Sequence, residues 1–476
     1  MTFDGLIGLL LGFNVVVLVY LALLNMAYLT TGILAFRHTR RHVVRLETLD
    51  LDRMVAGADT LPMSLIVPAY NEEATIVGAV RSFLSLRYPD YEVLVVNDGS
   101  SDGTIDRLLG AFEMERAHRF PSSDLATAQV RGLYRSRRHS GLWLIDKHNG
   151  GKADALNAGL NYCRTPVFCA IDADTLLEPE SLSRAVRPFL EDARTVATGG
   201  IIRVANGCTI RNGLIDEVHI PRNLIARIQV LEYLRAFLSA RMGWDALDST
   251  LIISGAFGAF RRSVVAAAGG YSSGTVAEDM ELVVRLHRYC RENAIPYRVS
   301  FSPDPIAWTE CPEDLVSLGN QRERWQRGLA QVLAKHRAML LNRRFGRPSL
   351  LGYSYYALFE LIGPVLEGLG YLGFLLAVAL GVASWPYMAA FFVLAFVLGM
   401  GFNFGAVGLE ELSFRRYSAG GDFRRLLLVG VVEVFGYRQL NTWWRLRGLW
   451  TFSRGERGWG SIRRTGFKDE VLGSRS

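Results

Sequence analysis

The stretch "MSLIVPAYNEE", residues 63 to 73, joins an apolar run of strand length to a polar end. Three similar runs follow, "YEVLVVND" from Tyr91, "LWLIDK" from Leu142 and "PVFCAIDAD" from Pro166. Segments long enough for helices, such as "EEATIVGAVRSFLSL", separate the first three runs. Apolar strands that alternate with helices are typical of a parallel sheet covered on both faces. The sequence therefore predicts an α/β domain over residues 62–345.

The chain before this domain is apolar. Residues 6–36 carry no charge and exceed the roughly 20 residues that a helix needs to cross a bilayer. We expect a transmembrane helix within residues 1–36 rather than a signal peptide, because Asp4 precedes the run and no cleavage site follows it. The basic cluster "RHTRRHVVR" comes next, so the positive-inside rule places the α/β domain in the cytoplasm, after a linker over residues 37–61.

A second apolar region dominates residues 346–449, for which transmembrane and interfacial helices are predicted. The aromatic stretch before Pro364 and the run from Leu426 to Tyr437 are expected at the membrane interface, unless the latter continues through "RQLNTWW" as a further span. A basic cytoplasmic tail follows over residues 450–476. The best spans are Leu366 to Val382 and Tyr387 to Leu409. The α/β domain is thus inserted between membrane helices of a multi-pass protein of the inner or plasma membrane.

The charge and the cysteines narrow the class of protein. The net charge is +7, and much of it lies in segments next to the apolar regions. An anionic lipid leaflet accounts for that distribution, and no nucleic-acid motif is present, so nucleic acid is not an expected partner. The five cysteines have no CxxC spacing, which fits a reducing compartment.

Polar side chains follow three of the predicted strands. In a parallel sheet, ligands bind beyond the carboxyl ends of the strands. Turns and helix caps also favour Asp and Asn, but four acidic side chains on three strand ends favour a binding site. These residues are Tyr70 and Glu72 after the first strand, Asp98 after the second, and Asp172 and Asp174 after the fourth.

Two segments near these strand ends suggest a bound phosphate and cation. Asp172 and Asp174 in "IDADT" are spaced to share a site with Mg²⁺ or Mn²⁺, which prefer oxygen ligands. "KHNGGKADALNAG" offers a glycine pair for close backbone approach and Lys152 at the start of a helix. The P-loop pattern GxxxxGK[ST] is missing, which disfavours a P-loop NTPase.

Three later segments are less specific when their residues are considered alone. Glu278 and Asp279 begin a predicted helix in "GTVAEDMEL", where they either complement the helix dipole or supply a general base, Asp279. Phe257 in "SGAFGAFRR" is either a packing residue or a floor under an acceptor sugar. "RGERGWGSIRRTGF", with Trp459, is basic and rich in glycine, a composition typical of a solvated tail.

The segment "NQRERWQRG" (320–328) is predicted to be a helix. Gln321, Arg324, Trp325 and Gly328 recur at helical spacing and share one face, while Arg322 and Arg327 are expected to meet lipid headgroups or solvent. An interfacial amphipathic helix with a tryptophan anchor is one interpretation. In the other, Arg324 neutralises a diphosphate and Trp325 stacks on a sugar.

Together these motifs resemble those of the membrane-embedded family-2 glycosyltransferases, the group that contains cellulose, chitin, hyaluronan and poly-N-acetylglucosamine synthases. "PAYNEE", "VNDGSSDGT", "GGKADALNAG", "DAD", "SGAFGAFRR", "EDMEL" and "QRERW" occur in the same order. The resemblance covers residues 62 to 340 and implies a GT-A fold with inverting transfer from a UDP-sugar. Ala277 stands where the family usually has Thr, which leaves the acid pair itself intact.

The resemblance also implies a role for each residue. Asp279 would be the catalytic base, and Asp174 would ligate Mg²⁺ or Mn²⁺. Tyr70, Glu72 and Asp98 would hold the uridine, Lys152 and Asp172 the nucleotide or its diphosphate, and Glu278 completes the acid pair. Phe257 and Trp325 would face the acceptor, Arg324 the diphosphate, and Trp459 the closed nucleotide site. Gln321, on the same helix face as Arg324 and Trp325, would be a further substrate-binding residue.

The resulting hypothesis is a synthase that polymerises sugar from UDP-N-acetylglucosamine and helps to move the growing glycan across the bilayer. Few spans are predicted for a channel, so an accessory membrane subunit or a homo-oligomer is an expected partner. A non-processive enzyme acting on a lipid acceptor is the alternative, which "QRERW" disfavours. An inactive nucleotide-sugar-binding scaffold of an export complex would be expected to lack a carboxylate, and all four are present.

Overall fold

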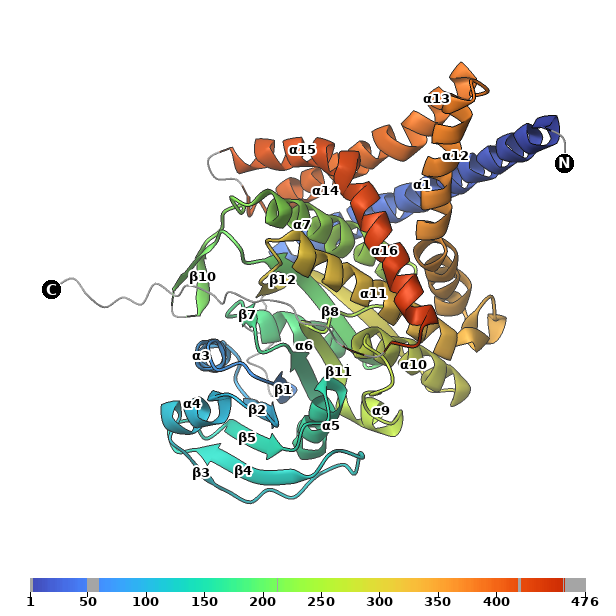
Figure 1. Cartoon of the computed structure of the whole chain (residues 1–476). Coiled ribbons are helices and arrows are strands. Elements are labelled where there is room, and N and C mark those ends of the chain that lie inside the picture. Colours follow the sequence, from blue (N-terminus) through green and yellow to red (C-terminus); the bar gives the residue numbers. More distant parts are fainter. Residues whose placement is uncertain (1–2, 49–59, 212, 418–420, 457, 459–476) are drawn as a thin grey trace.

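The computed structural model describes residues 3–48, 60–211, 213–417, 421–456 and 458. A ten-stranded mixed sheet lies at the centre, with the strand order β3-β4-β5-β2-β1-β6-β11-β8-β12-β7 (Figure 1). Its strands are β1 (Met63–Ala69), β2 (Tyr91–Asp98), β3 (Met114–Arg116), β4 (Val130–Ser136), β5 (Leu142–Lys147), β6 (Val167–Ile171), β7 (Thr175–Leu177), β8 (Thr195–Val204), β11 (Phe257–Arg261) and β12 (Arg298–Thr309). A separate hairpin pairs β9 (Thr209–Arg211) with β10 (Leu214–Glu217).

The four strands predicted from the sequence form one parallel part of this sheet, and β8 and β12 form another. β1 pairs in parallel with β2 and β6, and β2 pairs in parallel with β5. The remaining strands make the sheet mixed, because β11 runs antiparallel to both β6 and β8 and β4 runs antiparallel to β5. The α/β prediction is therefore confirmed, with antiparallel strands added on both sides.

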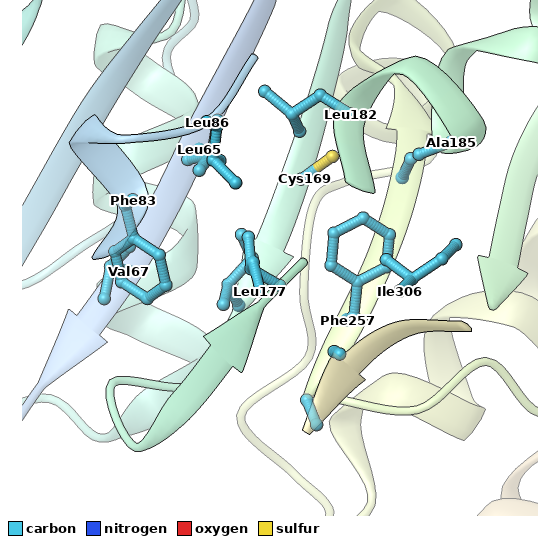
Figure 2. Packing of buried hydrophobic residues seen from close by; sticks show 14 of the residues in the cluster. Leu65, Val67, Phe83, Leu86, Cys169, Leu177, Leu182, Ala185, Phe257 and Ile306 are labelled. Atoms are coloured by element: carbon cyan, nitrogen blue, oxygen red, sulfur yellow. The ribbon is translucent and has the colours of Figure 1, made fainter. Parts of the chain in front are cut away.

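Helices cover both faces of the sheet, as the apolar strands require. Leu65 and Val67 of β1 pack with Phe83 of α3 in one core cluster (Figure 2), whereas Ile66 between them faces a second cluster. The helices of this domain are α3 (Ile76–Leu84), α4 (Thr104–Ala111), α5 (Lys152–Tyr162), α6 (Ser181–Glu191), α7 (Leu224–Tyr233), α8 (Met242–Ala246), α9 (Arg262–Ala267), α10 (Glu278–Glu292) and α11 (Leu315–Lys335). A π-helical segment, η1 (Leu234–Arg241), joins α7 to α8.

Three helical stretches of the described chain are long and apolar enough to cross a membrane: Asp4–Arg45, Pro348–Ala379 and Trp385–Ser413. The first lies in α1 (Phe3–Thr48), which continues well beyond residue 36, so part of the predicted linker is helical. The others include α12 (Gly363–Ala379), α13 (Trp385–Phe392) and α14 (Leu398–Ser413). The stretch before Pro364 is thus continuous with a candidate span.

The last apolar run is not one straight helix. α15 (Asp422–Val432) and α16 (Arg438–Ser453) are separated by η7 (Glu433–Tyr437), where Phe435 and Gly436 have non-helical backbone angles. Gly436 has φ +86°, which favours glycine. A further span through "RQLNTWW" is therefore absent from the described structure, and α16 packs instead along α11.

The apolar helices and the sheet domain are in direct contact. α1 packs against α8 so closely that a Cβ added to Gly243 would lie 2.5 Å from the carbonyl oxygen of Thr31. Farther along α1, His42 lies 3.1 Å from Asp304 of β12. Figure 1 shows α1 leaving the domain as one long helix, with α12 and α14 beside it.

Candidate active site

A cavity of about 2490 Å³ begins at the carboxyl ends of β1, β2 and β6 and extends to α1 and α14. It collects nearly all of the predicted site residues that the structure describes, from six separate parts of the chain. Those that line it are Tyr70, Glu72, Asp98, Lys152, Asp172, Asp174, Glu278, Asp279, Gln321, Arg324 and Trp325. The cavity lies where a sheet with parallel central strands is expected to bind ligands.

Lys152 holds two of the acidic segments together. It is the first residue of α5 and follows Gly151, whose φ of +87° turns the chain into the helix. Its Nζ lies 2.6 Å from Asp172 and 3.2 Å from Glu278. Burial alone would lower the pKa of Lys152, but the carboxylates of Asp172 and Glu278 outweigh it and raise the pKa above its ordinary value. Lys152 is therefore a fixed positive charge in the cavity.

Asp98 organises the glycine loop that leads to Lys152. One carboxylate oxygen accepts a hydrogen bond from the backbone N–H of Gly150 at 3.0 Å, and the other from Gly151 at 2.8 Å. The fully buried Lys147 also donates to Asp98. Asp98 thus fixes the backbone at the floor of the cavity, a role that the sequence did not indicate; its contact with uridine stays a prediction.

Asp279 is oriented by two backbone groups. Its Oδ2 accepts a hydrogen bond from Gly255 at 2.9 Å, and its Oδ1 accepts one from its neighbour Met280 at 2.7 Å. A Cβ added to Gly255 would lie 3.0 Å from the Nζ of Lys152, so this position brings the backbone against both groups. α10 begins at Glu278, as predicted, which puts the acid pair in its first turn.

The predicted face of α11 lies against the cavity and the acid pair. Gln321, Arg324 and Trp325 line the cavity, and a Cβ added to Gly328 would lie 2.6 Å from the Cβ of Ala277. Ala277 directly precedes the acid pair, so the helix packs on the start of α10 without room for a larger side chain at either position.

The expectation that Arg322 and Arg327 meet headgroups or solvent is wrong. Both side chains are buried, and Arg322 donates to Glu232 of α7 at 2.7 Å. The guanidinium of Arg322 lies 4.4 Å from the ring centroid of Trp325 and so supports the tryptophan from inside the protein. The helical repeat could not reveal this, because Glu232 is distant in the sequence.

The interpretation of Phe257 as a sugar floor is also wrong. Its side chain has no exposed surface and packs in the core with Cys169, Leu177 and Ile306 (Figure 2). The alternative of ordinary packing is correct for this residue, and Ser254 to Ala256 line the cavity in its place. Trp459 lies outside the described residues.

The acidic residues at the strand ends fit a divalent cation that takes one or two ligands from the protein and others from the phosphates of a substrate. No group of three or more metal-ligating side chains occurs within the described part of the chain. Asp172 faces Lys152, and Asp174 lines the cavity with a largely buried side chain. Mg²⁺ is commonly bound in this way, through one or two carboxylates and substrate phosphates.

Two family models match the part of the chain that carries these motifs. The model of glycosyl transferase family 2 matches residues 64–267, and that of glycosyl transferase family group 2 matches residues 167–404. The poly-beta-1,6-N-acetyl-D-glucosamine synthase of Staphylococcus epidermidis is 26% identical over 273 residues, which are 57% of this chain and 56% of that protein. The enzyme of the same name from Staphylococcus aureus strain COL is 25% identical over 274 residues, again 57% and 56%. The chain thus spans about half the length of these relatives.

Two solved structures are among those that match this chain. The mannosyltransferase PcManGT from Pyrobaculum calidifontis, in complex with GDP-Man and Mn²⁺, has a TM-score of 0.47 and 20% identity, and the match covers 87% of this chain and 99% of that one. TarS 1-349 of S. aureus has a TM-score of 0.37 and 14% identity, with 83% and 92% covered. The family models together span the sheet, the acid pair and α11, and with the mixed sheet they support an α/β domain of the GT-A type. The chain therefore belongs to glycosyl transferase family 2.

Proposed function

We propose that this protein transfers a sugar from a UDP-sugar, UDP-N-acetylglucosamine, onto a growing glycan. The observation that carries the proposal is the single cavity in which the strand-end acids, Lys152, the acid pair and the "QRERW" face of α11 meet. The similarity to poly-beta-1,6-N-acetyl-D-glucosamine synthases supports the choice of sugar and of polymer.

In this proposal the donor binds across the strand ends. Tyr70 and Glu72 after β1, with Asp98 at the end of β2, contact the uridine. The protonated Lys152, with Asp172 beside it, faces the diphosphate, and Arg324 approaches the same phosphates from α11. Fixed positive charges in a cavity stabilise the charge that develops on a leaving diphosphate.

Transfer proceeds by direct displacement with inversion. Asp279 takes the proton of the acceptor hydroxyl while its oxygen attacks the anomeric carbon. The bond from that carbon to the phosphate oxygen breaks, and its electron pair leaves with UDP. Gly255 and Met280 hold the carboxylate of Asp279 in place through their backbone N–H groups.

Asp174 would hold Mg²⁺ or Mn²⁺ together with the donor phosphates. When bound, the ion supplies charge neutralisation at the diphosphate. Asp174 is suited to this because its side chain is largely buried at the strand end yet lines the cavity.

The same cavity favours a membrane-linked product. Leu29, Ile33 and Phe36 of α1 and Phe402 of α14 line its far end, so a glycan leaving Trp325 would reach the candidate spans. This supports translocation of the glycan through the membrane helices, assisted by a small accessory subunit or by oligomerisation. It equally favours the second candidate, a single transfer to a lipid acceptor, which the length of the product distinguishes. The basic cluster after residue 36 favours a cytoplasmic catalytic domain.

Release of UDP by the purified full chain with Mn²⁺ and a panel of UDP-sugars tests the reaction. We expect turnover with UDP-N-acetylglucosamine and a loss of at least about 100-fold in Asp279→Asn, because a positioned general base contributes 10²–10⁴-fold. Asp106→Asn is the matched control, since Asp106 is an exposed acid in the first turn of α4. No UDP release from any sugar, or full activity in Asp279→Asn, would contradict the proposal.

The product identifies the acceptor. Incorporation of radiolabelled sugar, followed by digestion with linkage-specific hydrolases, should yield a long polymer that only the hydrolase for its linkage degrades. A product of one added sugar in the lipid fraction would support the lipid acceptor instead. Binding of UDP-sugar without turnover, unchanged by Asp279→Asn, would indicate a scaffold.

A further inference from the structure

Four partly or fully buried cations that line the cavity are paired with carboxylates. Lys152 contacts Asp172 and Glu278, and Arg322 contacts Glu232. On the wall formed by the apolar helices, Arg445 lies 2.9 Å from Glu360 and Arg235 lies 3.5 Å from Glu433. This pairing is expected, because a buried charge without a partner is strongly destabilising.

Arg241 departs from this pattern. It is the last residue of η1 and lines the cavity, and no carboxylate of the described chain lies within ion-pair distance of it. Its guanidinium lies 3.8 Å from the ring centroid of Phe237, and its Nη1 atom is buried without a hydrogen-bond partner among the described residues. Burial lowers the pKa of Arg241, although Tyr356 and Asp279 oppose the shift. An arginine nevertheless keeps its charge in a protein.

The position of Arg241 indicates which substrate it meets. η1 packs mainly against α1 and α14, which belong to candidate spans, and to a lesser extent against β8 and β12. Trp244, Tyr355 and Tyr356 line the same cavity and offer aromatic surfaces suited to sugar rings. Arg241 is thus placed on a segment that packs against the membrane helices, and it is close enough to Asp279 to interact with its charge.

We propose that Arg241 binds an oxyanion, a phosphate or a carboxylate, carried by the acceptor. The proposal rests on the proposed function and adds a charge to its acceptor. A neutral glycan offers the guanidinium only hydroxyl and carbonyl oxygens, whereas an oxyanion accepts two parallel charge-assisted hydrogen bonds and neutralises the charge. The phosphate of a lipid-linked acceptor and the carboxylate of an acidic glycan share this chemistry.

Equilibrium binding of three oligosaccharides tests the site without turnover. The probes are a neutral N-acetylglucosamine oligosaccharide, the same oligosaccharide with a reducing-end phosphate, and one with a uronic acid residue. Each is titrated into the purified full chain with Mn²⁺ and saturating UDP. We expect one anionic probe to bind at least about tenfold more tightly than the neutral one, as a charge-assisted pair implies. Tighter binding of the phosphate probe would indicate a lipid-linked acceptor. Tighter binding of the uronic acid probe would indicate an acidic glycan.

Arg241→Gln should abolish this preference and leave binding of the neutral probe unchanged, while Arg241→Lys should keep part of it. Arg37→Gln is the matched control, because Arg37 is an exposed arginine that lines the same cavity. It should keep the full preference. Equal binding of all three probes by the wild type, binding of none, or a preference that survives in Arg241→Gln would overturn the proposal.

These outcomes differ from failure of the proposed function. Loss of UDP release in every assay would contradict glycosyl transfer, yet the binding preference could still be present. Conversely, transfer to a neutral acceptor without any anionic preference would leave the proposed function intact and remove the role of Arg241. UDP binding by Arg241→Gln and Arg241→Lys confirms that each variant is folded.

Discussion

Trp325 is exposed to the cavity on one side and supported by a cation on the other. Its side chain is 44% exposed, and the guanidinium of Arg322 behind it is held by Glu232. Trp325→Ala should therefore remove a stacking surface for the acceptor and shorten the polymer, while UDP binding stays within about twofold, because stacking acts on the sugar alone. Product length and UDP affinity measure the two effects.

Trp385→Ala is the control for this prediction. Trp385 is 81% exposed at the start of α13 and does not line the cavity, so its removal should change neither quantity. An equal loss of UDP binding and elongation in Trp325→Ala would show that the tryptophan has only a structural role.

Gly328 sets the distance between α11 and the acid pair. An added Cβ would lie 2.6 Å from the Cβ of Ala277, and neither methyl can rotate away. Gly328→Ala should therefore shift the start of α10 and lower kcat by roughly tenfold to 100-fold, since small misplacements of catalytic groups are costly. The free energy of unfolding should fall by about 1–3 kcal/mol, as for other overpacked sites.

The control is Gly78→Ala in α3, where an added Cβ meets nothing within 4 Å. It should leave kcat unchanged and slightly stabilise the helix. Unchanged kcat in Gly328→Ala would show that α10 tolerates the shift and that the close contact is not catalytic positioning.

At the scale of elements, α10 is anchored by a buried histidine. Nε2 of His287 lies 2.8 Å from the carbonyl oxygen of Thr250, and Nδ1 lies 3.0 Å from the hydroxyl of Tyr297. Burial lowers the pKa of His287 to about 4, from about 6.5 in the unfolded chain. The neutral form is thus favoured by folding, and its contribution is complete above pH 6.5 and is lost as the pH falls towards 4.

That shift in the pKa of His287 corresponds to about 3 kcal/mol in the free energy of unfolding, present above pH 6.5 and lost below pH 4. Melting temperatures from pH 7 to pH 4 should fall less steeply in His287→Gln than in the wild type, although the variant is less stable at pH 7. His219→Gln, which alters an exposed histidine, should keep the wild-type slope. An equally steep fall in His287→Gln would mean that other groups cause the acid sensitivity.

Local sequence predicted the elements better than it predicted their partners. The apolar runs located β1, β2, β5 and β6, and the acid pair located the start of α10. The family resemblance placed Phe257 at the acceptor, and the helical repeat placed Arg322 at the surface. Both were wrong because neither β6 beside Phe257 nor Glu232 beside Arg322 is near in sequence. Arg241 was missed for the same reason, since lack of a partner is a property of the whole cavity. Whether a charged side chain is buried depends on contacts between segments that are distant in the sequence. The helical or strand repeat of one segment carries no information about those contacts.

At the scale of the whole molecule, a buried ion pair joins the sheet to a candidate span. Arg203 of β8 lies 2.9 Å from Glu410 of α14, and both side chains are almost fully buried. The guanidinium of Arg203 also lies 5.8 Å from the ring centroid of Trp308. The sheet domain and the apolar helices should therefore unfold together, because breaking the pair leaves a buried charge without a partner.

A double-mutant cycle in detergent tests this coupling. Arg203→Met and Glu410→Met should each cost about 3–5 kcal/mol, whereas the double variant should cost much less than their sum, because no uncompensated charge remains. The exposed pair of Arg211 and Asp216, 3.0 Å apart, is the control and should contribute less than about 1 kcal/mol. Additive losses in the Arg203 and Glu410 cycle, or two separate melting transitions in the wild type, would show that the sheet domain and the membrane helices are stabilised independently.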